Sequence, residues 1–193
     1  MVSKESIMSS REKILSAIKG IAREEKTLPS LPNYGVIGSL EEVFSQSILG
    51  NKGEVLSNSE FENWIQKQNF PKIISLARGL ESFSNMNLPE DPHELADLNL
   101  AILEGQFGVA ENGAIWVDDT QLRLRALPFI TEHLVIVVEK KNLFPTLHQA
   151  YQKIGDAHSG FGLFIAGPSK TADIEQSLVI GAHGAKSLRV VLV

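Results

Sequence analysis

Three segments of the chain show apolar residues at helical spacing, each after a serine followed three residues later by a glutamate. This Ser-x-x-Glu arrangement is typical of a capping box, in which the two side chains bond to the free N–H groups of the first helical turn. We therefore expect helices to begin at the following three pairs: Ser9/Glu12, Ser39/Glu42 and Ser59/Glu62. The first is an amphipathic helix, with Ile14, Leu15, Ile18 and Ile21 along one face.

Short apolar runs alternate with these and further helical patterns along the rest of the chain. Runs rich in β-branched residues and bounded by turns predict strands. The expected strands are Gly53–Leu56, Ile73–Leu76, Leu98–Leu103, Ala114–Val117, Leu134–Val138, 161–166 and Leu188–Val193. Two more helices are expected, over Pro145–Ile154 with proline in the first turn and over 172–180. Continuous apolar strands separated by helices predict an α/β fold with an open, mostly parallel, Rossmann-like sheet covered on both faces.

The organisation into parts follows from a break in this pattern. Thr27 to Gly38 contains two prolines and two glycines without periodicity, which is typical of a linker. We expect an N-terminal helix and linker over residues 1–38 and an α/β domain over 39–193. An extended linker would let the first helix pack on a partner chain, and a homo-oligomer is one way to do so.

Composition narrows the class of protein. The 193 residues are 43% hydrophobic and 21% charged, as in a globular domain, and the net charge of −5 argues against a nucleic-acid partner. The chain has no cysteine, which excludes disulfides, cysteine-ligated iron–sulfur clusters and cysteine nucleophiles within it. No targeting segment and no apolar stretch of about 18 residues is apparent, so we expect a cytoplasmic protein without a membrane partner.

One motif stands where a strand is expected to turn into a helix. The run Gly167-Pro168-Ser169-Lys170-Thr171 follows the strand 161–166 and precedes the helix expected at 172. A helix N-terminus attracts anions, and Lys170 adds a positive charge. However, Asp173 and Glu175 already complement the helix dipole and would repel a phosphate. A capped helix without a ligand is therefore an equal alternative, and the motif is neither a Walker A loop nor a dinucleotide fingerprint.

His183-Gly184 lies in the loop before the last strand. A single histidine in a turn is usually solvated, although Asp173 and Glu175 are near it in sequence. Because no HExxH or paired-histidine spacing accompanies it, we expect no metal site.

Three ionisable residues in the middle of the chain are chemical candidates. Glu111-Asn112-Gly113 precedes a strand, either as an ordinary entry turn or as a junction that holds a carboxylate for use as nucleophile, base or ligand. Arg125 is suited to bind a carboxylate or phosphate as a planar fork, or to form an ion pair with Glu111 or another acid. His133 stands before the strand 134–138.

Together these blocks resemble the LUD-domain family, also called lactate-utilization protein C. The family pattern has A-E-T-G-T, an Arg followed by L-P and a His, and a final G-P-S-R-T-A-D-I-E with G-x-H-G-P. The corresponding segments here are Ala110–Ala114, Arg125–Pro128 with His133, Gly167–Glu175 and Gly181–Ala185. The match covers roughly residues 95–193. Asn112 replaces the usual threonine and Ala185 the usual proline.

The resemblance implies a fold of the NagB/ribose-5-phosphate isomerase/CoA-transferase type. It also implies a role in oxidation of L-lactate to pyruvate, alongside iron–sulfur partner proteins that would carry the clusters this cysteine-free chain lacks. A second similarity, of Glu111-Asn112-Gly113 to the S-E-N-G motif of family I CoA-transferases, suggests an acyl or CoA transferase with Glu111 as nucleophile. A non-catalytic scaffold is a third alternative.

We therefore expect the polar residues of these motifs to line one crevice at the carboxyl ends of the strands. That crevice would bind a small anionic ligand or dock a redox partner, with no cofactor and no metal held by this chain alone. The expected catalytic residues are Glu111 and Arg125. The expected ligand-binding residues are Asn112, Gly113, His133, Gly167, Ser169, Lys170, Thr171, Asp173, His183 and Gly184.

Overall fold

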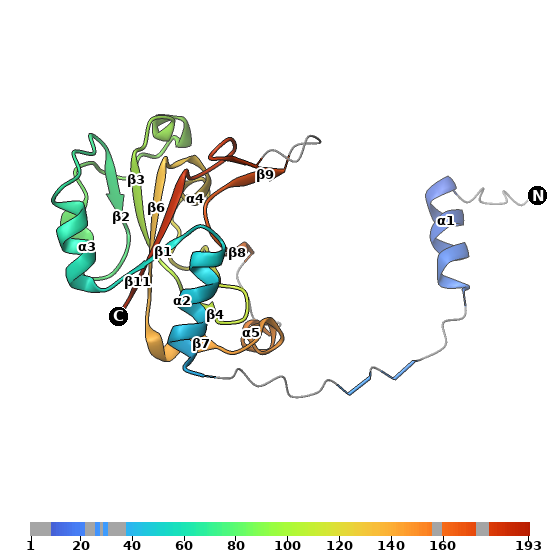
Figure 1. Ribbon diagram of the computed structural model, residues 1–193. Coiled ribbons are helices and arrows are strands. Elements are labelled where there is room, and N and C mark those ends of the chain that lie inside the picture. The colour runs from blue at the N-terminus through green and yellow to red at the C-terminus, as the bar shows by residue number, and fades with distance from the viewer. Residues whose placement is uncertain (1–8, 22–25, 28, 31–37, 156–159, 173–177) are drawn as a thin grey trace, which may run out of the picture. The chain divides into compact units, whose positions relative to one another are not determined.

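The structure, a computed structural model, describes residues 9–21, 26–27, 29–30, 38–155, 160–172 and 178–193 (Figure 1). The chain divides into two compact units, Met1–Asn33 and Tyr34–Val193. In the first unit, helix α1 spans Ser10–Lys19 and begins with the expected capping box. The Ser9 backbone N–H donates to the Glu12 carboxylate at 2.8 Å, and the Glu12 N–H donates to the Ser9 hydroxyl at 3.3 Å.

The second unit is built on a five-stranded sheet whose strands all run parallel (Figure 1). Its order is β1 (Glu54–Leu56), β11 (Ser187–Leu192), β6 (His133–Val138), β3 (Leu100–Glu104) and β2 (Ile73–Ser75). The open parallel sheet expected from the sequence is confirmed. The first and last strands of the chain are neighbours, with Val55 opposite Val190.

Alternate residues of these strands serve two separate hydrophobic clusters. On one face, Leu103, Ile136 and Val190 pack with Phe44 and Ile48 of helix α2 (Leu40–Gly50). On the other face, Ile102, Val135 and Val191 pack with Phe61 and Ile65 of helix α3 (Asn58–Ile65). Because side chains alternate along a strand, continuous apolar runs bury both faces of the sheet, as a parallel sheet requires.

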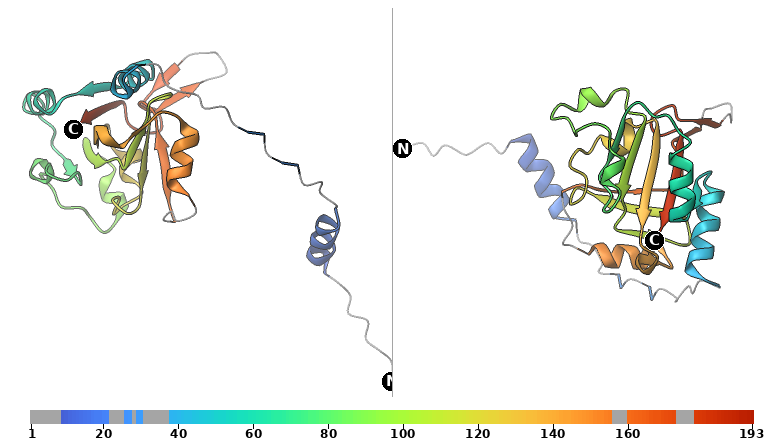
Figure 2. Two further views of the ribbon diagram at one scale, coloured as in Figure 1. Left: turned by 90° about the horizontal axis from the view of Figure 1, so that it is seen from below. Right: turned by 90° about the vertical axis from the view of Figure 1, so that its left-hand side faces the viewer.

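A smaller mixed sheet covers the α2 face. Its order is β7 (Leu143–Phe144), β4 (Phe107–Val109), β5 (Ala114–Asp118) and β8 (Gly162–Ile165), with helix α5 (Leu147–Ile154) beside it. Figures 1 and 2 show this sheet and α5 on the opposite side of the large sheet from α3. Strands β4 and β8 run antiparallel to β5. The strands expected over 114–117 and 161–166 thus belong to this smaller sheet, and the turn at Asn112-Gly113 joins β4 and β5 as a hairpin.

The remaining elements are short. They are helix α4 (Leu127–Ile130) and the 3₁₀ helices η1 (Glu81–Phe83), η2 (Pro92–Leu95) and η3 (Lys140–Asn142). Among the described residues, no helix combines the length and the apolar character that a membrane crossing needs.

Two expected helix starts are shifted. Helix α3 begins two residues early, because Ser57 rather than Ser59 forms the capping box, with Glu60. Helix α5 begins after Thr146, whose hydroxyl accepts from the Gln149 N–H, so Pro145 lies outside it.

The prediction of a helix over 172–180 is wrong for the described residues, because both ends of this segment belong to strands. Strands β9 (Lys170–Ala172) and β10 (Leu178–Ile180) form an antiparallel pair in which Thr171 lies opposite Val179. The Gly181 N–H donates to the Ser169 carbonyl at 2.9 Å and so extends the pairing. Residues 173–177 lie outside the described part of the chain. The β-branched residues Thr171, Val179 and Ile180 favour this extended conformation.

Candidate functional site

Two adjoining hollows gather most of the motif residues near the C-terminus. The first, of about 520 Å³, lies among the loops before β3, β6 and β11. The second, of about 310 Å³, lies between α4 and the chain from β8 to β9. Both are lined by Phe129, His183 and Gly184, which makes these three residues the common wall.

The first hollow lies at the amino ends of the parallel strands. Its walls come from 96–99, 129–132, 181–184 and Lys186, segments that lead into β3, β6 and β11. We expected a crevice at the carboxyl ends of these strands. For the described motif residues that position is wrong, because the hollow lies at the opposite ends. The reason is topological: the loop with His183 and the turn before His133 both precede their strands.

The second hollow brings together five of the ten expected ligand-binding residues, namely Gly167, Ser169, Lys170, His183 and Gly184. Backbone hydrogen bonds hold the two motifs against each other, since the Ser169 N–H donates to the Ala185 carbonyl at 2.9 Å. A Cβ at Gly184 would lie 3.1 Å from the Ser169 Cβ, so this close approach suits glycine. Residues 167–170 and 181–185 thus form one structural unit.

An ion pair stands at the rim of the first hollow. Lys186 Nζ lies 2.7 Å from Glu132 Oε1, and Asn99 Nδ2 donates to Glu132 Oε2 at 3.3 Å. The hydrogen bond from Lys186, helped by that from Asn99, lowers the pKa of Glu132 below its ordinary value. Neither Lys186 nor Asn99 was expected in the site. Their place becomes clear only once 99, 132 and 186 meet at the start of neighbouring strands.

The surroundings of the hollows are partly apolar. Phe129 and Ile130 of α4 are exposed, and so are Val179 and Ile180 of β10, which leads into the Gly181–Gly184 turn. Four exposed large apolar side chains on two elements beside a polar hollow are typical of a surface that meets another molecule.

Asn51, at the end of α2, connects Lys170 of the β9–β10 hairpin to the turn at 111–113. Its carbonyl accepts from Lys170 Nζ at 3.0 Å, and its Nδ2 donates to the Asn112 carbonyl at 2.7 Å. At Gly167, where φ is +82°, a Cβ would lie 2.3 Å from the Asn51 carbonyl oxygen. Asn112 and Lys170 are therefore brought together through a residue that sequence reasoning missed.

The turn itself has the ordinary geometry of a hairpin. Asn112 Oδ1 accepts from the Ala114 N–H at 3.0 Å, and Gly113 has a φ of +66° with its Cα packed on Ser47 and Ile48. The exposed Glu111 carboxylate accepts from the Leu147 N–H at 2.6 Å and so caps the first turn of α5. Glu111 lines neither of the two hollows.

Arg125 also lies outside the lining of both hollows. Its Nη2 is 2.6 Å from Asp119 Oδ2, and its guanidinium carbon lies 5.2 Å from the centre of the Phe161 ring. The arginine thus pairs with another acid, as one of the two alternatives expected.

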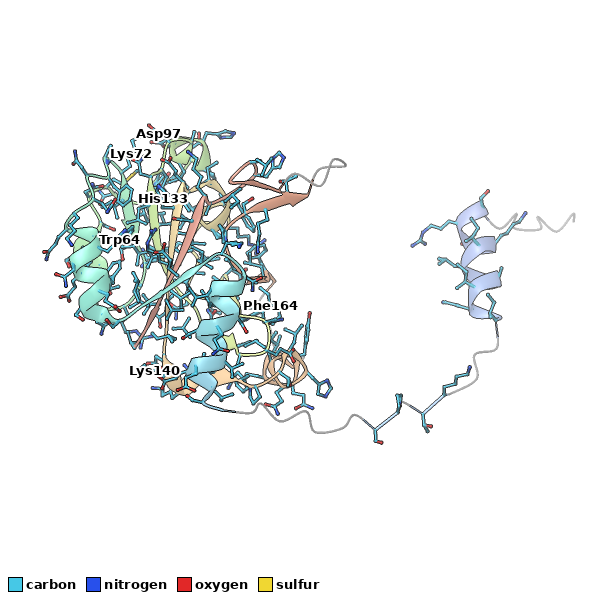
Figure 3. All side chains as sticks on the ribbon, in the orientation of Figure 1. Trp64, Lys72, Asp97, His133, Lys140 and Phe164 are labelled. Carbon is cyan, nitrogen blue, oxygen red and sulfur yellow. The ribbon has the colours of Figure 1, made fainter. Side chains whose placement is uncertain are left out.

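His133 lies on the α3 side of the large sheet, as Figure 3 shows with Trp64, and it lines neither hollow. Its Nδ1 is 2.8 Å from Ser187 Oγ, and its ring centre is 5.3 Å from that of Phe70. Burial lowers the pKa of this imidazole. Of the other expected residues, Thr171 lies in β9, and Asp173 is outside the described residues.

Residues 4–193 match the LUD domain. The chain belongs to the LUD domain family. The match extends over both hollows and the turn at 111–113.

Relatives of this LUD-family chain carry one recurring name. This chain is 33% identical over 90 residues to "Lactate utilization protein C" of Bacillus pumilus, and the match covers 44% of this chain and 38% of the relative. It is 32% identical over 114 residues to the protein of that name from an Exiguobacterium species, covering 54% and 49%. The matched segments span less than half the length of these relatives.

The fold has a counterpart in a solved structure. A crystal structure of a DUF162 family protein from Deinococcus radiodurans superposes with a TM-score of 0.58 at 16% identity, covering 79% of this chain and 95% of the other. This likeness supports the α/β fold of the LUD-family chain.

The chemistry open to the LUD-domain hollows is that of binding and positioning. They offer a hydroxyl from Ser169, an imidazole from the exposed His183 and the ammonium groups of Lys170 and Lys186. Among the described residues, no cluster of three or more His, Cys, Asp or Glu side chains could hold a metal ion.

Proposed function

We propose that this LUD-family chain works in L-lactate utilization, with iron–sulfur partner proteins, in the oxidation of lactate to pyruvate. The observation that carries the proposal is the convergence of the two family-like motifs, 167–171 and 181–185, on the second hollow. The relatives named lactate utilization protein C support the assignment to lactate utilization.

The division of labour follows from the reaction. Oxidation of lactate to pyruvate removes two electrons and two protons, and the electrons need an acceptor. The chain has no cysteine with which to ligate an iron–sulfur cluster, so the proposed partners hold the clusters. This chain then contributes binding and orientation.

The hollows supply groups suited to a small carboxylate. Lys170, Lys186 and the Ser169 hydroxyl donate hydrogen bonds, and charge-assisted bonds to carboxylates are among the stronger ones in proteins. Glu132 already pairs with Lys186, which leaves Ser169, Lys170 and His183 as the groups proposed to bind the anion. Phe129 and Ile130 beside them give the partner an apolar area to cover.

The test is growth on L-lactate as sole carbon source in a strain that lacks this gene. Wild-type protein should restore growth, whereas the Ser169→Ala/His183→Ala double variant should restore less at an equal protein level. Glu111→Gln, outside both hollows, serves as the matched control and should grow like wild type. Normal growth of the deletion strain would overturn the lactate role, and full rescue by the double variant would overturn the role of the hollow.

The partner role is tested separately by affinity capture from lactate-grown cells. The tagged chain should retain cysteine-rich iron–sulfur proteins, and Phe129→Ser should retain fewer of them. Tyr151→Ser removes another exposed aromatic ring, from α5, and should leave capture unchanged. Capture that is absent, or that is indifferent to Phe129→Ser, would contradict docking at this surface.

A further inference from the structure

Helix α1 carries an apolar face that its own unit does not bury. Ile14, Leu15 and Ile18 are 60%, 39% and 51% exposed, and none of the ten helical residues is buried. An isolated helix of fewer than about 12 residues is marginal in water, and amphipathic helices gain most of their stability from packing. The capping box alone does not replace that packing, so α1 needs a surface to bind.

The charges of α1 flank this face. At 100° per residue, Ile14, Ile18 and Leu15 fall within a sector of about 100°, with Lys13 beyond one edge and Lys19 beyond the other. Arg11 lies at the N-terminal end of this face, so the basic residues of α1 outnumber its one acid, Glu12. A surface that binds α1 should therefore be apolar along its floor and acidic along its sides.

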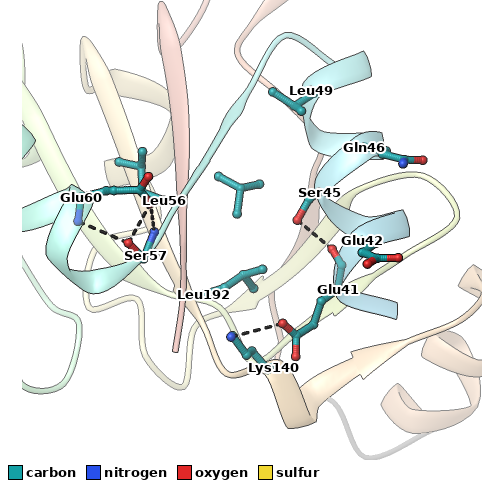
Figure 4. A pocket seen from close by; sticks show the side chains of 11 residues that line it. Glu41, Glu42, Ser45, Gln46, Leu49, Leu56, Ser57, Glu60, Lys140 and Leu192 are labelled. Carbon is teal, nitrogen blue, oxygen red and sulfur yellow. Dashed lines mark hydrogen bonds and ion pairs between the residues drawn. The ribbon is translucent and has the colours of Figure 1, made fainter. Parts of the chain in front are cut away.

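A groove in the second unit has this character. It measures about 510 Å³ and runs between α2 and the start of α3, over the ends of β1 and β11. Figure 4 shows Leu56 and Leu192 in its walls and Leu49 near one end. Leu49 is 58% exposed, although it belongs to a helix whose other large apolar residues face the core.

The sides of the groove are acidic. Glu41 and Glu42 line it from α2, and Glu60 lines it from α3. The lining has a single lysine, Lys140, whose Nζ lies 3.2 Å from Glu41 Oε2, so that its positive charge is neutralised. The carboxylate of Glu60 accepts from the Ser57 N–H at 2.8 Å and remains at the rim as an anion.

The dimensions also agree. The α2 residues that line the groove run from Glu41 to Leu49, a rise of about 12 Å at 1.5 Å per residue. Ile14 to Ile18 spans about 6 Å by the same measure and fits within that length. The apolar stripe of α1 thus fits within the groove and complements it in polarity and charge.

We propose that α1 of a second copy of this chain occupies the groove between α2 and α3. Residues 27–38, between α1 and α2, show no helical or strand periodicity in their sequence, which is typical of a linker that lets α1 reach a neighbouring molecule. Reciprocal exchange places two such contacts about a two-fold axis, which closes the assembly as a dimer. This interface is independent of the hollows around His183.

Cysteine cross-linking provides the direct test, because the chain has no native cysteine. Ile18→Cys and Leu49→Cys are placed on copies with different tags, mixed, and treated with a bismaleimide. The cross-linked product should contain both tags. Leu49→Cys is replaced by Tyr151→Cys on α5 as the matched control, which should give little mixed product.

The oligomeric state provides the second measurement. Wild-type protein should scatter light as a dimer, and Ile14→Lys/Ile18→Lys should raise the dimer dissociation constant at least about tenfold. Ser16→Lys, on the opposite face of α1, should leave it unchanged. A monomer at all concentrations, or a chain with both cysteines that links only within itself, would overturn the proposal.

Discussion

The ammonium group of Lys170 donates to the backbone carbonyl of Asn51 at 3.0 Å, across 119 positions of sequence. This bond fixes the base of the β9–β10 hairpin to the end of α2. Asn51 also holds the 111–113 turn through its side chain. The 167–171 motif and the 111–113 turn are thus both bonded to Asn51, and the conformation around Gly167 depends on this residue.

Gly167→Ala should destabilise the second unit by at least about 2 kcal/mol. The φ of +82° disfavours any side chain, and the new Cβ would lie 2.3 Å from the Asn51 carbonyl oxygen, a backbone atom that cannot easily move. Urea denaturation measures the loss. Gly50→Ala, in α2 with no atom within 4 Å of its Cβ, is the control and should be neutral or gain about 0.5 kcal/mol. Equal midpoints for the two variants would contradict the geometry at Gly167.

Ser57→Ala should cost about 1 kcal/mol of stability, since the Ser57 hydroxyl accepts from the Glu60 N–H at the start of α3. Ser59→Ala should cost little, because Ser59 lies inside the helix. Thermal unfolding followed by circular dichroism distinguishes the two. A larger loss at Ser59 would place the helix start where the sequence pattern alone suggested it.

Glu111→Ala should lower stability by about 0.5–1 kcal/mol, through loss of the acceptor for the Leu147 N–H at the N-terminus of α5. Glu111→Gln keeps an acceptor oxygen and should lose less. Chemical denaturation gives both values.

The same carboxylate was the expected nucleophile for acyl transfer, which mass spectrometry can test. Wild-type protein incubated with a panel of acyl-CoA thioesters and trapped with hydroxylamine should show no modification at Glu111. A hydroxamate there would establish nucleophilic chemistry despite the capping role.

His133 should make the protein less stable as the pH falls below about 6.5, its ordinary pKa. Burial lowers the pKa in the folded state, so in this window the unfolded chain takes up the proton that the folded protein refuses. The contribution of neutral His133 to the free energy of unfolding is complete above pH 6.5 and is lost as the pH falls towards the pKa of the folded state. Denaturation at pH 7.5 and pH 5.5 measures the difference, which His133→Gln should reduce. An unchanged pH dependence in that variant would show that other groups cause it.

The sequence allowed much of the fold to be predicted, because its signals are local. The Ser9 capping box and the apolar runs of β6 and β11 need no distant partner to be recognised. The start of α3 was misplaced by two residues because Ser57/Glu60 and Ser59/Glu62 satisfy the same rule.

The β9–β10 hairpin could not be predicted in this way. The sequence around Ser169 and Thr171 provides helix-capping residues and acids in their usual order, so it fits a helix start by every local criterion. What decides the outcome is tertiary pairing, of Thr171 with Val179 and of Ser169 with Ala185. Backbone pairing and β-branched packing outweigh a capping pattern of this kind.

The structure brings the motif residues near the C-terminus together, but at the other end of the parallel strands from the one expected. Ser169, Lys170 and His183 do meet in one hollow. Glu111, Arg125 and His133 find partners elsewhere, in Leu147, Asp119 and Ser187. Those partners are distant in sequence for Glu111 and His133, which is why spacing alone did not reveal them.

The position of β11 between β1 and β6 has a consequence for how the protein is made. Strand β1, near residue 54, pairs with a strand that leaves the ribosome only after residue 187 has been synthesised. Until then α2 and α3 flank an edge whose neighbour does not yet exist, and the sheet cannot close by local contacts alone. Synthesis of this chain should therefore expose apolar surface for most of its duration, with folding completed late.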